Sequence, residues 1–115
     1  EYVFVDGGMA DNPRYALYKA KYEAMIANKM NEEADTTYTV AGKCCESGDM
    51  LVMDIKLPKA EQDDLLIVPS TGAYNYSMSS NYNRLPKLPV VFVKDGTSRL
   101  VIKGETLEDL ISQDI

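Results

Sequence analysis

The chain contains no histidine, and its only two cysteines are adjacent, at Cys44 and Cys45. The absence of histidine excludes histidine-ligated zinc sites and histidine-activated nucleophiles from these 115 residues. Two neighbouring cysteines do not make a disulfide framework, because a bridge between adjacent residues is strained. We therefore expect reduced thiols and a cytoplasmic protein.

Positive charge is also scarce, with 12 basic against 18 acidic residues and a net charge of −6. The basic residues form no stripe and do not alternate with aromatic residues, as they would in a nucleic-acid-binding surface. No apolar run approaches the length of a membrane span, and no signal-peptide pattern opens the chain. We expect neither nucleic acid nor a membrane as a partner.

The length of 115 residues is typical of one domain that buries a core without staples. No linker rich in proline or glycine divides the chain, so we predict a single domain over residues 1–115. The first residue is not methionine, and residues 1–5 already have the pattern of a strand. We expect the chain to begin inside a longer protein.

Short segments rich in β-branched and aromatic residues predict a mainly β fold, either a barrel or a sandwich. Asp95-Gly96 is a strong signal for a hairpin turn. Thr106 begins a short terminal helix that extends to Ser112, with Asp109 completing a capping box. The predicted strands cover residues 1–5, 18–28, 36–43, 50–57, 65–68, 89–93 and 98–103, and the run at 65–68 is apolar enough for a strand buried on both faces.

Residues 13–27 are ambiguous between helix and strand. Tyr15, Tyr18 and Tyr22 fall near helical spacing, whereas alternate residues from Ala16 to Ile26 form an unbroken apolar series. Alanine and lysine favour a helix, but the alternating tyrosines suit a pleated face. We predict a strand over residues 18–28 and a polar loop over residues 30–35.

The turn Cys44-Cys45-Glu46-Ser47-Gly48-Asp49 places a soft nucleophile next to two carboxylates. If the preceding strand reaches Cys45, the two thiols point to opposite faces, and only one can enter a given site. A buried core cysteine followed by a surface turn would have the same sequence pattern. The turn becomes informative only through the segments that accompany it.

Several segments together resemble the C-terminal half of the diaminopimelate decarboxylase family, and the resemblance covers nearly the whole chain. In chain order they are Val5-Asp6-Gly7-Gly8-Met9; Asn12-Pro13-Arg14 with Leu17-Tyr18; Gly42 with Cys45-Glu46-Ser47-Gly48-Asp49; Thr71-Gly72-Ala73-Tyr74; Ser77-Met78-Ser79-Ser80-Asn81-Tyr82-Asn83; and Arg99-Leu100-Val101 with Glu105-Thr106-Leu107-Glu108-Asp109-Leu110. The segment around residues 31–35 and the loop at 59–64 lie outside it.

The resemblance implies a C-terminal, Greek-key-like β-barrel domain of an enzyme that depends on pyridoxal 5′-phosphate. The reaction would convert meso-2,6-diaminopimelate into L-lysine and CO2, the last step of lysine biosynthesis. The lysine that forms the Schiff base would lie in an N-terminal (β/α)8 barrel outside this chain, so the isolated fragment should be inactive. The active site would lie at the interface of a homodimer.

The same resemblance assigns roles to five residues. Arg14 and Tyr18 would bind the distal carboxylate of the substrate, because a guanidinium offers the two-pronged contact that a carboxylate needs. Cys45 would donate a proton to the reacting carbon, and Glu46 would pair with a substrate ammonium. Tyr74 would contribute its hydroxyl to both cofactor and substrate. No metal ligand is expected.

Two rival functions remain. A decarboxylase of ornithine, arginine or carboxynorspermidine has the same fold, but the distal end of its substrate gives no reason for Arg14 and Tyr18 together. A non-catalytic binding module could use the Cys45-Glu46 turn for partner contact, although it would not need Arg14 and Tyr74 as well. The residues before Glu1 would settle the cofactor question, if they include a lysine after a barrel strand.

Overall fold

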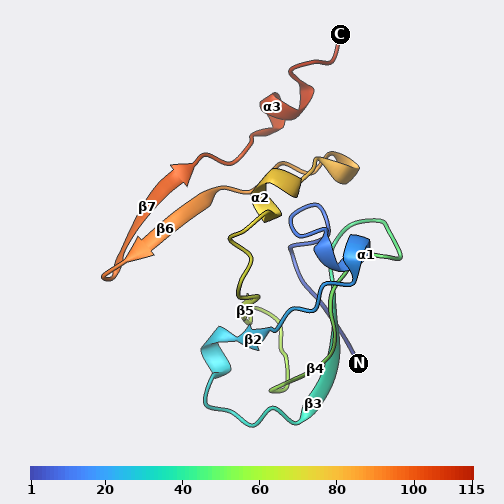
Figure 1. Cartoon of the computed structure of the whole chain (residues 1–115), viewed down its shortest axis with the longest axis vertical. Coiled ribbons are helices and arrows are strands. Elements are labelled where there is room, and N and C mark those ends of the chain that lie inside the picture. The colour runs from blue at the N-terminus through green and yellow to red at the C-terminus, as the bar shows by residue number, and fades with distance from the viewer. The chain divides into compact units, whose positions relative to one another are not determined.

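The computed structural model describes residues 1–115, and its contacts divide the chain into two compact units. The first unit contains Glu1–Ser79, and the second contains Ser80–Ile115. Figure 1 gives the order of the elements along the chain. The single domain over residues 1–115 stays a prediction.

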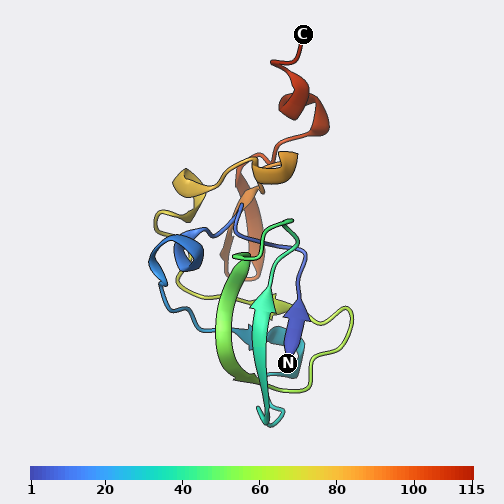
Figure 2. The same ribbon diagram turned by 90° about the vertical axis from the view of Figure 1, so that its right-hand side faces the viewer.

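The main sheet of the first unit has three strands, β1 (Tyr2–Phe4), β3 (Thr36–Ala41) and β4 (Met50–Leu57), in the order β1-β3-β4. Figure 2 shows these strands side by side, with β3 in the middle. β1 pairs with β3 in parallel, and β3 pairs with β4 antiparallel through an irregular register. The strands predicted at 1–5, 36–43 and 50–57 are confirmed, but β3 ends at Ala41, before the two cysteines.

The strand predicted over residues 18–28 is wrong. A short helix, α1 (Arg14–Tyr18), ends at Lys19, whose φ of 57° is left-handed, and only β2 (Met25–Ile26) pairs as a strand before the 3-10 turn Ala27–Lys29. Between them the chain has no regular secondary structure, and Ala24 and Ile26 are buried while Lys21 and Glu23 are exposed. The alternation in the sequence therefore reports which side chains face inward, and it does not report hydrogen-bonding partners.

β2 pairs antiparallel with β5 (Leu66–Ile67) in a two-stranded sheet of its own. The strand predicted at 65–68 is present, but it is shorter, and its burial on both faces is wrong because Leu65 and Ile67 are exposed. Only one side of this small sheet covers the core. A one-turn helix, α2 (Asn75–Met78), follows near the end of the first unit.

The core of the first unit is packed around the β3–β4 hairpin. One group of buried side chains contains Ala24, Val40, Leu51 and Val52, with Tyr22 packed against it. A second group contains Ile26, Tyr38 and Leu57. Burial of these apolar side chains is the main favourable contribution to folding of the unit.

The second unit is built on one hairpin, β6 (Val90–Lys94) and β7 (Thr97–Ile102), joined by Asp95-Gly96. Both turn residues have positive φ, 50° and 73°, as a two-residue hairpin turn requires, which confirms the predicted hairpin. The predicted terminal helix is also confirmed. In α3 (Leu107–Ile111), Thr106 accepts a hydrogen bond from the Asp109 amide, and the Asp109 carboxylate accepts one from the Thr106 amide.

The chain is therefore mostly β, with a few short helices. Its strands form three separate sheets, of three, two and two strands. No helix is both long enough and apolar enough to cross a membrane.

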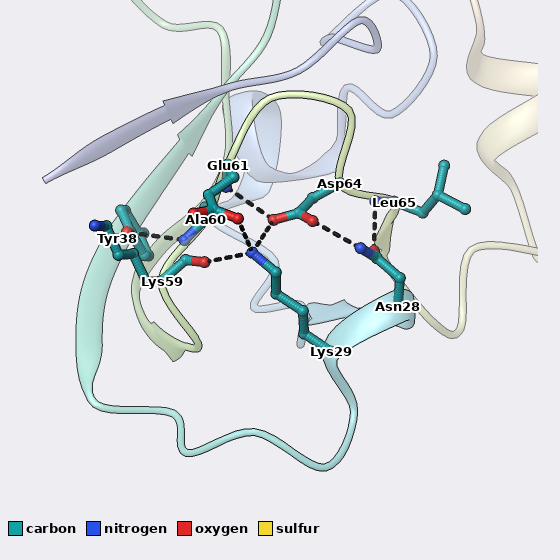
Figure 3. Close-up of polar contacts among 8 residues, drawn as sticks. All are labelled: Asn28, Lys29, Tyr38, Lys59, Ala60, Glu61, Asp64 and Leu65. Carbon is teal, nitrogen blue, oxygen red and sulfur yellow. Dashed lines mark hydrogen bonds and ion pairs between the residues drawn. The ribbon is translucent and has the colours of Figure 1, made fainter.

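A polar network fixes the loop between β4 and β5 to the 3-10 turn that follows β2 (Figure 3). The Lys29 ammonium lies 2.9 Å from Asp64 and 3.0 Å from Glu61, and it also donates to the carbonyl of Lys59. Asp64 accepts further hydrogen bonds from the Asn28 amide group and the Glu61 backbone. These donors, with Lys29 the foremost, lower the pKa of Asp64 to about 2.

We expect Asp64→Asn to destabilise the full-length protein at pH 7 and to have progressively less effect as the pH falls. The pKa of Asp64 is depressed to about 2, so its ion pair stabilises the fold above the ordinary aspartate pKa and is lost as the pH falls toward 2. The measurement is the melting temperature of both proteins from pH 7 to pH 2.5. The neighbouring exposed residue provides the control, Asp63→Asn, and a gap that stays constant over this range would contradict the prediction.

Candidate functional site

A buried carboxylate organises the turn between β3 and β4. Asp49 is 3% exposed, and it accepts hydrogen bonds from the backbone amides of Met9 at 2.6 Å and Cys44 at 2.7 Å. The backbone amide of Lys43 donates to the Gly7 carbonyl at 3.1 Å. The turn at 44–49 is thus fixed to the loop that follows β1.

This arrangement explains Gly42. A Cβ atom at residue 42 would lie 2.6 Å from the carboxyl carbon of Asp49, a distance that side chains do not tolerate. The absence of a side chain therefore lets the Asp49 carboxylate lie against the backbone, where it can accept two amide hydrogen bonds.

The two cysteines face different environments, and neither forms a disulfide. Cys44 is 9% exposed, whereas Cys45 is exposed, so only one of the two thiols is accessible. The strand that was expected to separate them by alternation is absent there, because both residues lie in a bend beyond the end of β3. Burial, with Asp49 nearby, raises the pKa of Cys44 and keeps that thiol protonated.

Glu46 lies on the exposed side of the same turn. Its carboxylate accepts hydrogen bonds from the Gly48 amide at 3.1 Å and from the Ser47 hydroxyl at 3.3 Å. The Asp49 amide donates to the Glu46 carbonyl at 3.0 Å. These local bonds hold the turn in one shape, with Cys45 and Glu46 next to each other at its surface.

Arg14 lies between two tyrosines. Its Nη1 atom donates to the Tyr22 hydroxyl at 3.0 Å, and its guanidinium carbon lies 5.4 Å from the centre of the Tyr74 ring, within the range of a cation–π contact. The backbone amide of Arg14 donates to the buried Asn12 side chain at 3.4 Å, which holds the start of α1. The structure thus brings Arg14 and Tyr74 together, two of the five predicted site residues.

Tyr18 is the last residue of α1 and is 63% exposed. Because Arg14 and Tyr18 are four residues apart on a helix, they lie on the same face, one turn apart. The helix α1 therefore supplies a reason for their pairing.

Tyr74 is 67% exposed and has a φ of 71°, an uncommon conformation for a residue with a side chain. Its carbonyl accepts hydrogen bonds from the Met78 amide and the Ser77 hydroxyl. The next residue, Asn75, is buried, and its Oδ1 atom has no hydrogen-bond partner. A buried acceptor without a hydrogen-bond partner is uncommon in folded proteins.

Two contributors were missed from the sequence. Tyr22 appeared only as one member of an alternating series, and Asp49 only as the end of a motif. The Met9–Asp49 contact joins residues 40 positions apart, so no local pattern could reveal it. No group of three or more acidic or cysteine side chains is arranged to hold a metal ion.

Comparisons with known proteins agree on one family. Residues 1–72 match the family described as the C-terminal sheet domain of pyridoxal-dependent decarboxylases. Diaminopimelate decarboxylase of Bacillus subtilis is 58% identical over 115 residues, and the protein of the same name from Staphylococcus aureus is 54% identical. The aligned residues make up 100% and 99% of this chain but 26% and 27% of those proteins, so the chain spans about a quarter of the length of these relatives.

A solved structure agrees with the sequence relatives. The crystal structure of diaminopimelate decarboxylase from M. jannaschii, in co-complex with L-lysine, superposes with a TM-score of 0.91 and 35% identity. It covers 99% of this chain and 26% of that one. The similarity thus extends through both units of the chain.

Proposed function

The chain belongs to the family of the C-terminal sheet domain of pyridoxal-dependent decarboxylases, and we propose that it forms part of a diaminopimelate decarboxylase. The whole protein would convert meso-2,6-diaminopimelate into L-lysine and CO2. The similarity of the full chain to relatives of that name supports this function. The structural observation that carries it is the Arg14 guanidinium, held against Tyr74 at the surface of the first unit.

The donor set of the chain fits a role beside pyridoxal phosphate. Tyr74 exposes a phenol that can donate a hydrogen bond, and Cys45 exposes a thiol that can transfer a proton. The Lys29 ammonium is engaged in ion pairs with Asp64 and Glu61, which raise its pKa and disfavour the neutral amine that reacts with an aldehyde. We assign the covalent lysine to the part of the protein outside this chain.

Each side chain then has a definite task. Arg14 binds the carboxylate at the end of the substrate that does not react, with Tyr18 one helical turn away on the same face. Glu46 pairs with the ammonium group of that end. When bound, pyridoxal phosphate supplies an electron sink for the charge left by loss of CO2. Cys45 donates the proton that replaces the lost carboxylate at the reacting carbon.

We extend the proposal to the whole protein, because this chain spans about a quarter of the length of its relatives. We propose that an N-terminal (β/α)8 barrel binds the cofactor and that this chain is a C-terminal, Greek-key-like β-barrel domain. We further propose a homodimer in which the Cys45-Glu46 turn reaches the site of the partner subunit, and a location in the cytoplasm.

The full-length protein tests the function directly. Purified with pyridoxal phosphate, it should release CO2 from meso-diaminopimelate and form L-lysine, and it should turn over ornithine and arginine far more slowly. A preference for ornithine or arginine would favour the rival decarboxylases. No turnover of any of these amino acids would favour the binding module.

We expect Arg14→Lys in the full-length enzyme to raise KM for diaminopimelate by about tenfold to a hundredfold, a loss of roughly 1–3 kcal/mol. Lysine keeps the charge but loses the two-pronged contact with the carboxylate. The measurements are steady-state kinetics and the cofactor absorbance, which should not change. Arg99→Lys, at an exposed position on β7, is the matched control, and an unaltered KM for Arg14→Lys would leave Arg14 as a surface residue.

A further inference from the structure

Tyr22 connects the core of the first unit to Arg14. Its ring packs against the buried group that contains Val40 and Leu51, and its hydroxyl lies 3.0 Å from Nη1 of Arg14. The left-handed residue Lys19 ends α1, and the chain then turns back so that Tyr22 reaches both the core and Arg14. The ring of Tyr22 is therefore fixed against the core, and its hydroxyl is available to orient the guanidinium of Arg14.

The second contact of Arg14 completes this arrangement. The Tyr74 ring lies 5.4 Å from the guanidinium carbon, so the guanidinium is in contact with two aromatic side chains at once. An unrestrained arginine samples many rotamers and must lose that freedom when it binds a ligand. A guanidinium already oriented by two contacts loses less, and the hydrogen bond to Tyr22 uses only one of its five N–H donors.

We propose that Tyr22 is a positioning residue for recognition of the substrate carboxylate, acting through Arg14. This inference rests on the proposed function of Arg14. Tyr22 does not touch the reacting atoms, so its hydroxyl should affect how tightly a carboxylate is held and not the rate of the chemical step. Its effect should also be confined to ligands that carry a carboxylate at this end.

The chemistry of the reaction supplies a matched pair of probes. Loss of one carboxylate from diaminopimelate gives L-lysine, which keeps the carboxylate at the other end of the molecule. Cadaverine has the same five-carbon chain and two amines but no carboxylate. L-lysine should therefore depend on the Arg14–Tyr22 pair, and cadaverine should not.

The test is Tyr22→Phe in the full-length holoenzyme, since phenylalanine keeps the ring in the core and removes only the hydroxyl. We expect KM for diaminopimelate and the inhibition constant of L-lysine to rise together by about threefold to tenfold, as for loss of one hydrogen bond. The kcat and the inhibition constant of cadaverine should stay within about twofold of the values for the unmodified enzyme. The melting temperature should stay within about 2 °C, as for a substitution at the surface. Tyr15→Phe is the control, because the Tyr15 hydroxyl donates to the Met53 sulfur and not to Arg14.

A double variant tests whether Tyr22 acts through Arg14. In the Arg14→Lys background, Tyr22→Phe should have no additional effect on the KM for diaminopimelate. An equal loss in both backgrounds, or equal weakening of L-lysine and cadaverine, would overturn the proposal, as would a lower melting temperature with an unchanged KM. An unmodified enzyme without diaminopimelate decarboxylase activity would overturn the proposed function and this role together, whereas an active enzyme unaffected by Tyr22→Phe would overturn this role alone.

Discussion

Cys45→Ala in the full-length enzyme is expected to lower kcat by about 10²- to 10⁴-fold, the contribution typical of a positioned proton donor. Cys45 is the exposed thiol of the pair, so its loss should leave the melting temperature nearly unchanged. The measurements are steady-state rates of lysine formation and thermal melts of the same preparations.

The adjacent cysteine provides the control for this experiment. Cys44 is buried, and burial raises its pKa, so its thiol is neutral and enclosed. Cys44→Ala should cost about 1 kcal/mol of stability and leave kcat within a fewfold of the unmodified enzyme. Equal kinetic damage from both substitutions would remove the distinction between the two thiols, and normal turnover by Cys45→Ala would exclude it as the proton donor.

The largest loss of stability is expected for Asp49→Ala, at about 3–5 kcal/mol. The substitution removes a buried charge that accepts hydrogen bonds from the amides of Met9 and Cys44, and both amides then lack a partner. The enzyme should also lose activity at temperatures below its unfolding transition, because the Cys44 backbone that carries Cys45 is no longer fixed. Ser47→Ala, on the exposed side of the same turn, is the control.

Gly42 offers an independent check on this geometry. Gly42→Ala should also destabilise the protein, because the added Cβ would overlap the Asp49 carboxyl group. In combination with Asp49→Ala the penalty should be smaller than the sum, since the shorter side chain makes room for the added methyl group. Strict additivity of the two losses would show that the carboxylate and residue 42 do not compete for the same space.

The elements predicted correctly are those whose signals are local. The Asp95-Gly96 turn and the Thr106 capping box each require only a few neighbouring residues, and both were found where expected. The alternation over residues 18–28 also identified the inward-facing positions, but it could not reveal that most of them have no strand beside them. Pairing depends on β5, which is distant in the sequence.

The candidate site was also predicted only in part: its local motif was found, but its long-range contacts were not. The motif placed Cys45 and Glu46 on one turn, and the structure confirms an exposed thiol next to a buried one. The contact between Arg14 and Tyr22 could not be predicted, because it requires α1 to end at Lys19 and the chain to turn back. Likewise, Asp49 has its role only once β1 has brought Met9 to the end of β3.

The parallel pairing of β1 with β3 also determines the order in which the first unit can assemble. Their partners, such as Val3 and Val40, are far apart in the sequence, and α1 and β2 lie between them. We expect closure of such a loop to be slow compared with formation of the β3–β4 hairpin, whose strands are near neighbours. The Met9 amide reaches Asp49 only after that closure, so we expect the turn that presents Cys45 to reach its final shape late in folding, when β1 has joined the sheet.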